Sequence, residues 1–340
     1  MPEQHMERYS RQILFQPIGR PGQERLLASR VVVIGQGALG TVIADHLARA
    51  GVGHLVLVDR DFVELSNLQR QTLFDEEDAH QRLPKAIAAA RKLARVNSEI
   101  EIAPLIADVT PRNVEELIAG ANLVMDATDN LETRLLLNDA CLKAGIPWIY
   151  GGAVGSSGIV MNIVPGETPC LRCLIDEPPP PGVLPSCDTV GVLNATTATV
   201  ASIQTAEALK LLTGHAPAAG VLYLDVWEGT FDRMPLERRP DCPACVQRNF
   251  EYLAGARTAW TTVLCGRNAV QIVPPDERGI SLEDLAGRLA NVGRVTYNGF
   301  LLSLEVDGRE LVIFPTGRAI IKGTTDEAEA RTLYARYIGT

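Results

Sequence analysis

Short, uninterrupted runs of aliphatic residues alternate with helical patterns along the first half of the chain. The runs are rich in β-branched side chains and lack polar alternation, which is typical of strands buried on both faces. Such strands are predicted at residues 30–34, 54–58 and 123–125, and a further strand is predicted at 100–102, where Glu101 interrupts the run. Helices are predicted at residues 7–29, 41–50, 85–96 and 113–119. This alternation indicates an α/β fold built on a doubly wound, mostly parallel sheet.

The pattern changes after residue 145. Segments 146–165 and 221–235 predict strands joined by Gly-rich turns, so we expect the sheet to continue into an antiparallel half. Between them, prolines at 178–181 and 185 exclude a helix or a central strand. We interpret this stretch as an extended crossover that leads to Cys187. A helix of small residues is predicted at 189–212.

A second, smaller unit is predicted at residues 256–340, after a first domain at 1–250. Ser281 and Asp284 open a short helix in the manner of a capping box. Strands are expected around the turn at 307–308, and a last helix at 326–338. These elements indicate a small α+β module of unknown function.

Composition and charge narrow the class of protein. Hydrophobic residues make up 46% of the chain and charged residues 21%, the balance of a soluble globular protein. No run reaches the roughly 18 apolar residues of a membrane span, and no secretory signal is evident, so we expect a cytoplasmic protein with no membrane partner. The net charge of −9 argues against a nucleic-acid partner.

A glycine-rich segment, GQGALG at residues 35–40, connects the first buried strand to a helix. Gly35, Gly37 and Gly40 let the backbone turn tightly and approach a phosphate, and the helix N-terminus offers unpaired N–H groups. Asp59 ends the second strand, where its carboxylate is suited to accept hydrogen bonds from ribose hydroxyls. By itself this Rossmann-like pattern favours a nicotinamide or flavin enzyme, because it is so widely shared.

The polar residues that follow the second and fourth strands favour a different chemistry. A nucleotidyl transfer must neutralise a triphosphate and hold Mg²⁺, whereas a dinucleotide needs only its pyrophosphate bound. Arg70 and Lys85 are suited to the first task and Asp129 to the second. A solvated loop of mixed charge is the alternative for each residue taken alone. Their joint placement at strand ends favours an ATP site.

Four of the seven cysteines form two C-x-x-C pairs, Cys170 with Cys173 and Cys242 with Cys245. Four thiolates at this spacing suit one tetrahedral, structural Zn²⁺ that would join two distant loops. Buried free cysteines are the alternative, and a redox pair is disfavoured because neither pair follows a thioredoxin-like strand. Cys141 lies in an apolar helical stretch and is predicted to be a core residue.

The chain resembles the MoeB/ThiF/HesA family of adenylyltransferases, which are related to ubiquitin-activating enzymes. The matching segments are RYSRQ at 8–12, the glycine segment, SNLQRQ at 66–71, DATDN at 126–130 and the sequence from Cys170 onward. They are collinear and span about residues 5–250. The resemblance implies an ATP-dependent enzyme with Mg²⁺ and a structural Zn²⁺ at the two cysteine pairs.

The resemblance also implies roles for individual residues. Asp59 would hold the ribose, with Asp61 in the same nucleotide-binding set. Asn67, Arg70 and Lys85 would contact the phosphates, and Asp129 would work with Mg²⁺. In this family a residue at the position of Arg11 reaches across a homodimer to the ATP of the partner, whereas the sequence alone predicts an exposed helix charge.

Two further cysteines are open to more than one interpretation. A cysteine at the position of Cys187 accepts an acyl group in ubiquitin-activating relatives and enters sulfur transfer in ThiF, and the alternative here is an inert thiol. Cys265 is assigned to packing, although some eukaryotic relatives carry a persulfide cysteine in an additional domain.

The implied reaction is adenylylation of the C-terminal glycine carboxylate of a ubiquitin-like sulfur carrier that ends in Gly-Gly, of the MoaD or ThiS type. A sulfur donor, for example a cysteine desulfurase, would then form the thiocarboxylate used in molybdopterin or thiamine synthesis. Two alternatives remain: an NAD-dependent oxidoreductase, and a non-catalytic scaffold that binds nucleotide and carrier.

Overall fold

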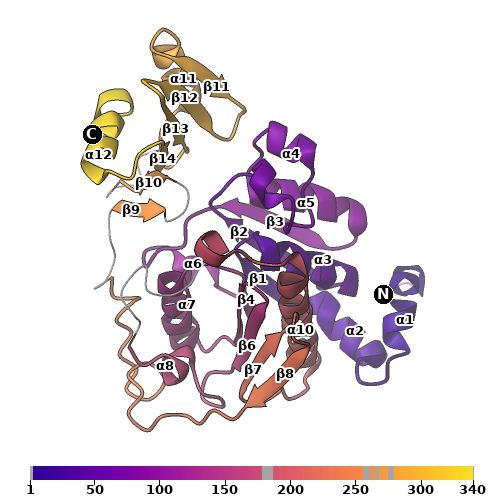
Figure 1. Ribbon diagram of the computed structural model, residues 1–340. Coiled ribbons are helices and arrows are strands. Elements are labelled where there is room, and N and C mark those ends of the chain that lie inside the picture. The colour runs from indigo at the N-terminus through magenta and orange to yellow at the C-terminus, as the bar shows by residue number, and fades with distance from the viewer. Residues whose placement is uncertain (1–2, 178–186, 256–260, 265–267, 275–278, 340) are drawn as a thin grey trace. The chain divides into compact units, whose positions relative to one another are not determined.

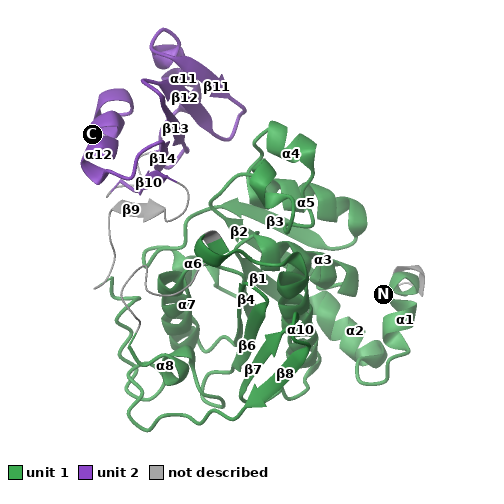
Figure 2. Cartoon of the chain, in the orientation of Figure 1, with its two compact units in different colours: residues 1–256 green, residues 257–340 purple. Residues whose placement is uncertain are grey.

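The chain forms two compact units, residues 1–256 and 257–340, in a computed structural model (Figure 1, Figure 2). The structure describes residues 3–177, 187–255, 261–264, 268–274 and 279–339. The proline crossover at 178–186 and Cys265 lie outside the described residues. Within the described residues, no helix is long and apolar enough to cross a membrane.

Unit 1 is built on an eight-stranded sheet in the order β3-β2-β1-β4-β5-β6-β7-β8. The strands from β3 to β5 pair in parallel, and those from β5 to β8 pair antiparallel. This confirms a mostly parallel doubly wound sheet that continues into an antiparallel half. The strands are β1 Arg30–Ile34, β2 His54–Asp59, β3 Glu101–Ile106, β4 Leu123–Asp126, β5 Trp148–Val154, β6 Ser157–Ile163, β7 Val221–Asp225 and β8 Thr230–Met234.

Helices cover both faces of this sheet (Figure 1). On one face, α3, α5 and α10 pack together, with α2 against α10. On the other, α6 and α7 bury leucines and valines against β1, β2 and β4. The helices of unit 1 are η1 Glu3–Tyr9, α1 Ser10–Ile13, α2 Gly19–Ala28, α3 Ala38–Ala50, η2 Leu65–Asn67, α4 Glu76–His80, α5 Lys85–Val96, α6 Val114–Leu117, α7 Leu131–Ala144, α8 Leu171–Leu174, α9 Cys187–Val190 and α10 Asn194–Thr213.

Most predicted elements agree with the structure, and β1 and α5 agree to the residue. The single helix predicted at 7–29 is wrong, because the structure has three shorter helices there. The break between α1 and α2 contains Pro17, and Gly19 adopts a left-handed backbone with φ of 55°. Both residues interrupt a regular helix.

Unit 2 is a six-stranded antiparallel sheet in the order β11-β12-β13-β14-β10-β9. Helices α11 and α12 bury leucines against it, which forms a separate hydrophobic core. Ser281 accepts a hydrogen bond from the Asp284 N–H at the start of α11, as predicted. Its elements are β9 Thr261–Leu264, β10 Ala269–Ile272, α11 Leu282–Leu289, β11 Arg294–Tyr297, β12 Leu302–Val306, β13 Arg309–Ile313, β14 Ala319–Lys322 and α12 Glu327–Tyr337.

Candidate nucleotide site and cysteine cluster

The glycine-rich loop joins β1 to α3, and its backbone is packed so closely that two of its glycines leave no room for a side chain. A Cβ atom placed on Gly40 would lie 1.9 Å from the Gly35 carbonyl oxygen, and one on Gly35 would lie 2.5 Å from the Ala127 oxygen. Gly35 also has φ of 93°, which other residues rarely adopt. Among the described residues beyond its immediate chain neighbours, a Cβ on Gly37 would meet only the Gln71 amide nitrogen, at 4.0 Å. The loop therefore leaves open space at Gly37, at the N-terminus of α3.

Asp59 connects this loop to the end of β2. One carboxylate oxygen accepts a hydrogen bond from the Gln36 N–H at 2.6 Å, and the other accepts one from the Asp61 N–H at 2.7 Å. Burial raises the pKa of Asp59, and the positive charge of Lys85 opposes that rise. Each carboxylate oxygen has a further lone pair for a ligand hydroxyl. Asp59 is thus oriented by backbone N–H groups and still able to bind ribose.

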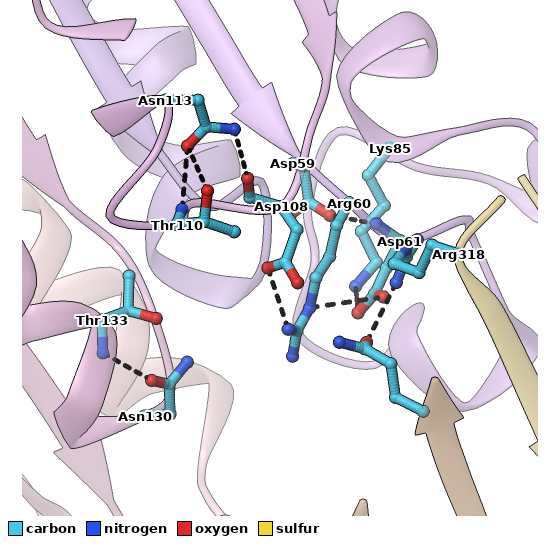
Figure 3. A network of polar contacts seen from close by, with 11 residues as sticks. Asp59, Arg60, Asp61, Lys85, Asp108, Thr110, Asn113, Asn130, Thr133 and Arg318 are labelled. Atoms are coloured by element: carbon cyan, nitrogen blue, oxygen red, sulfur yellow. Dashed lines mark hydrogen bonds and ion pairs between the residues drawn. The ribbon is translucent and has the colours of Figure 1, made fainter. Parts of the chain in front are cut away.

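Lys85 lies in the same cluster, because it is the first residue of α5 and points back toward β2. Its side chain is only 6% exposed, and Nζ lies 3.7 Å from the Asp61 carboxylate. Figure 3 shows Lys85 and Asp61 beside Asp59. A buried ammonium at this position can offer its remaining N–H groups to a phosphate.

The segment after β2 presents two more of the predicted phosphate ligands. Asn67 is buried in η2, and its side-chain oxygen accepts a hydrogen bond from the Glu64 N–H at 3.1 Å. Arg70 is half-buried, and one guanidinium nitrogen donates to the Ser66 carbonyl at 3.0 Å. The other guanidinium N–H groups remain to bind an anion.

Asp129 is exposed in the loop that connects β4 to α7. Hydrogen bonds fix the loop backbone both before and after Asp129. Asn130 caps α7 by accepting a hydrogen bond from the Thr133 N–H at 2.8 Å (Figure 3). Arg134 pairs with buried Asp126 at 3.2 Å and donates to the Thr128 carbonyl at 2.7 Å. These contacts fix the backbone that presents the Asp129 carboxylate.

Arg60 and Asp108 also lie at this edge of the sheet, although the sequence predicted no role for them. Their side chains form an ion pair at 3.0 Å between the ends of β2 and β3 (Figure 3). Burial opposes the charge on Arg60, but Asp108, Asp61 and Asp129 outweigh it and raise its pKa. An arginine between two aspartates, the sequence DRD at 59–61, indicates locally that Arg60 forms an ion pair. Its partner Asp108 could be found only from the pairing of β2 with β3.

Arg11 does not lie near the glycine loop of its own chain. It is exposed in α1, and its neighbour Gln12 donates a hydrogen bond to the carbonyl of Ala50, the last residue of α3. The glycine loop is at the opposite end of α3, which has 13 residues and is therefore about 20 Å long. The structure thus separates Arg11 from the other predicted nucleotide ligands.

The four cysteines of the two C-x-x-C pairs come together although 68 residues separate the pairs. Their sulfur atoms all lie within 4.8 Å of one another, with 3.6 Å between Cys170 and Cys242 and 3.6 Å between Cys173 and Cys245. A tetrahedral Zn²⁺ with Zn–S bonds of 2.3 Å needs sulfur atoms about 3.8 Å apart. The donor set and its spacing fit a structural zinc, with Cys170, Cys173 and Cys242 buried and Cys245 half-buried.

Cys187 begins α9, directly after residues 178–186, which lie outside the described part of the chain. Its thiol donates to the Ala153 carbonyl of β5 at 3.3 Å. Arg134 also contacts β5, at the Gly151 carbonyl, while holding the Asp129 loop. Cys187 is therefore near the end of a strand that adjoins the candidate site. Cys141, in contrast, is fully buried in α7, where burial raises the pKa of its thiol, which confirms it as a core residue.

The fold and this edge of the sheet define a nucleotide-binding α/β protein, and comparisons with known proteins give its family. Residues 9–244 match the ThiF family, so the chain belongs to the ThiF family. It is 45% identical over 335 residues to the sulfur carrier protein ThiS adenylyltransferase of Bacillus subtilis, covering 98% of this chain and 99% of that protein.

A second relative supports this assignment, and a solved structure shares the fold. The chain is 45% identical over 242 residues to the SAMP-activating enzyme E1 of Haloferax volcanii, covering 71% of this chain and 88% of that protein. A crystal structure of E. coli MccB with ATP has a TM-score of 0.62 and 24% identity, over 70% of this chain and 74% of that one. The structural match shows that the fold is shared.

Proposed function

We propose that this protein uses ATP to adenylylate the C-terminal glycine carboxylate of a ubiquitin-like sulfur carrier of the MoaD or ThiS type. The observation that carries the proposal is the convergence of the glycine loop, Asp59, Lys85 and the Asp129 loop at one sheet edge. The names of the relatives at 45% identity, sulfur carrier protein ThiS adenylyltransferase and SAMP-activating enzyme E1, agree with it. We assign the activity to residues 1–250 and place the protein in the cytoplasm.

The chemistry needs positioning more than covalent help from the protein. A carboxylate oxygen of the carrier attacks the α-phosphorus, the bond to the bridging oxygen of the β-phosphate breaks, and pyrophosphate leaves. Arg70, Lys85 and Asn67 bind phosphate oxygens and stabilise the charge that develops on them. A Mg²⁺ held by Asp129 would neutralise further phosphate charge.

Labelled pyrophosphate exchange tests this function against the alternatives. Exchange into ATP should require a carrier with a free Gly-Gly terminus. A scaffold would bind ATP and carrier without exchange, and an oxidoreductase would instead change nicotinamide fluorescence. Of the three functions, only adenylyl transfer requires the charges of Arg70, Lys85 and Asp129.

We further propose a homodimer in which Arg11 completes the site of the partner. The position of Arg11 at the far end of α3 from its own glycine loop supports this arrangement. Leu14 and Phe15, which are 70% and 60% exposed, would be covered by a second copy.

Subunit mixing tests the shared site. Arg11→Ala and Asp129→Ala should each be inactive alone. In an equal mixture, half of the dimers are heterodimers with one intact site, because one chain supplies Arg11 to the Asp129 of the other. Pyrophosphate exchange should then recover to about a quarter of the wild-type rate. No recovery after demonstrated subunit exchange would show that Arg11 does not act across the dimer.

Cys187 is proposed to act after adenylylation, in acyl capture or in sulfur transfer from a donor such as a cysteine desulfurase. The thiol has no part in phosphate chemistry, so Cys187→Ala should leave pyrophosphate exchange nearly unchanged. It should slow thiocarboxylate formation and abolish a covalent adduct of carrier and enzyme on a non-reducing gel. Collapse of exchange would place Cys187 in the nucleotide site or the fold, and normal thiocarboxylate formation would make it a bystander.

A further inference from the structure

Strand β4 leaves the sheet soon after it has paired with its neighbour β5. Among the described residues the two strands pair in parallel at two positions, Val124 with Trp148 and Met125 with Ile149. β4 ends one residue later, whereas β5 continues in its pairing with β6. The loop that carries Asp129 begins where the two strands separate. The position of Asp129 therefore depends on how the end of β4 is held against β5.

Gln204 of α10 connects the two strands beyond their last pair. Its side-chain nitrogen donates to the Asp126 carbonyl of β4 at 2.8 Å and to the Ile149 carbonyl of β5 at 3.3 Å. A carboxamide carries two N–H groups, so one is available for each carbonyl. Gln204 is fully buried, and its oxygen has no hydrogen-bond partner among the described residues. The contribution of this side chain to the fold therefore lies in its two donors.

Gly151 of β5 leaves the space that this carboxamide fills. A Cβ placed on Gly151 would lie 2.3 Å from the carbon and 2.4 Å from the nitrogen and the oxygen of the Gln204 amide. These nearly equal distances mean that the face of the amide covers Gly151. A side chain at position 151 would displace the amide from the two carbonyls.

On the opposite face of the sheet, Arg134 of α7 holds the same strand ends. Its guanidinium pairs with the Asp126 carboxylate at 3.2 Å. It also donates to the Thr128 carbonyl at 2.7 Å and to the Gly151 carbonyl at 3.1 Å. The segment that leads to Asp129 is thus fixed from both faces, by a charged side chain on one and by a neutral amide on the other.

We propose that Gln204 is a positioning residue for adenylyl transfer. Its amide holds the end of β4 against β5 and so sets the place of the Asp129 carboxylate, which is proposed to bind Mg²⁺ with the nucleotide. A displacement of about 1 Å in such a group can lower the rate by about a hundredfold. This role rests on the proposed function for the reaction. It comes from α10, which supplies none of the nucleotide ligands assigned above.

Gln204→Met tests this role, because it keeps the approximate volume and removes both donors. The Kd of ATP is measured by calorimetry, once with Mg²⁺ and once with EDTA in its place. Without Mg²⁺ the variant should bind ATP as wild type does, whereas with Mg²⁺ it should bind about tenfold more weakly, because Asp129 is displaced. Carrier-dependent pyrophosphate exchange at saturating MgATP should also fall by about tenfold or more. A purely structural role would lower thermal stability without any dependence on Mg²⁺.

The double variant Gln204→Ala with Gly151→Ala separates packing from hydrogen bonding. The methyl group added at position 151 would occupy space that the amide leaves, and it would keep water from bridging the two carbonyls. The double variant should be more stable than Gln204→Ala alone, because the cavity is smaller. It should nevertheless keep the Mg²⁺-dependent loss of ATP affinity.

Thr205→Val is the matched control on the same helix. Thr205 follows Gln204 in α10 and is 4% exposed, and its hydroxyl donates to the Ala201 carbonyl at 2.8 Å, within the helix. This variant also removes a buried donor, but one that does not connect β4 to β5. Its ATP affinities with and without Mg²⁺ and its exchange rate should equal those of wild type.

A wild-type Kd for MgATP in Gln204→Met, or an equal loss with and without Mg²⁺, would overturn the role of Gln204. Recovery of the wild-type exchange rate in the double variant would overturn it as well. If Gln204→Met does not fold, the double variant decides by the same ratio of Kd values. The proposed function fails separately: wild-type protein that binds MgATP but never exchanges pyrophosphate with any Gly-Gly carrier contradicts adenylylation, whatever the ratio of Kd values in the Gln204 variants.

Discussion

Carrier-dependent pyrophosphate exchange should fall by about a hundredfold or more when Asp129 or Arg70 is replaced by alanine. Each substitution removes a charge proposed to act on the triphosphate as the α-phosphorus is attacked, and such interactions contribute roughly 3 kcal/mol or more to the barrier. The effect should appear in the rate at saturating ATP, measured with labelled pyrophosphate.

Exposed charges elsewhere in unit 1 provide the controls for this experiment. Arg95 lies in the last turn of α5, the helix that begins with Lys85, and Glu116 lies on α6. Arg95→Ala and Glu116→Ala should exchange pyrophosphate at the wild-type rate. Full exchange in Asp129→Ala and Arg70→Ala would instead contradict the assignment of the nucleotide site.

The second large effect concerns the cysteine cluster. Purified protein should contain about one zinc per chain, and Cys242→Ser should lose most of it together with several kcal/mol of stability, because binding of a structural zinc contributes directly to folding. The corresponding fall in the midpoint of thermal unfolding is roughly 10 °C for a unit of this size. Metal analysis and calorimetry measure the two losses together.

Cys141→Ala separates loss of metal from loss of a buried sulfur. Cys141 is fully buried in α7 and does not belong to the four-cysteine cluster. This variant should be somewhat less stable because of the small cavity, yet keep its full zinc content. A wild-type protein that is stable without metal would show that the four thiols are held by packing alone.

The candidate nucleotide site could be predicted in part from the sequence, because the residues proposed for it follow strands with a strong local pattern. The glycine segment marks the β1–α3 turn, and Asp59 and Asp126 end β2 and β4. In a parallel sheet the carboxyl ends of neighbouring strands meet at one edge, so these residues were expected to lie near one another. This reasoning did not identify Asp108, because no local motif marks it.

The sequence by itself determined the alternation of strands and helices, the glycine loop and the two cysteine pairs. These depend on periodicity, backbone freedom and ligand spacing, which act over a few residues. Only the tertiary structure decided that the two cysteine pairs meet across 68 residues, that Arg60 pairs with Asp108 between neighbouring strands, and that the chain from 7 to 29 breaks near Pro17. It also decided that Arg11 lies a helix length from its own glycine loop. Each of these outcomes depends on which distant segments pack together. The burial of apolar surface over the whole core determines that packing, and no local pattern encodes it.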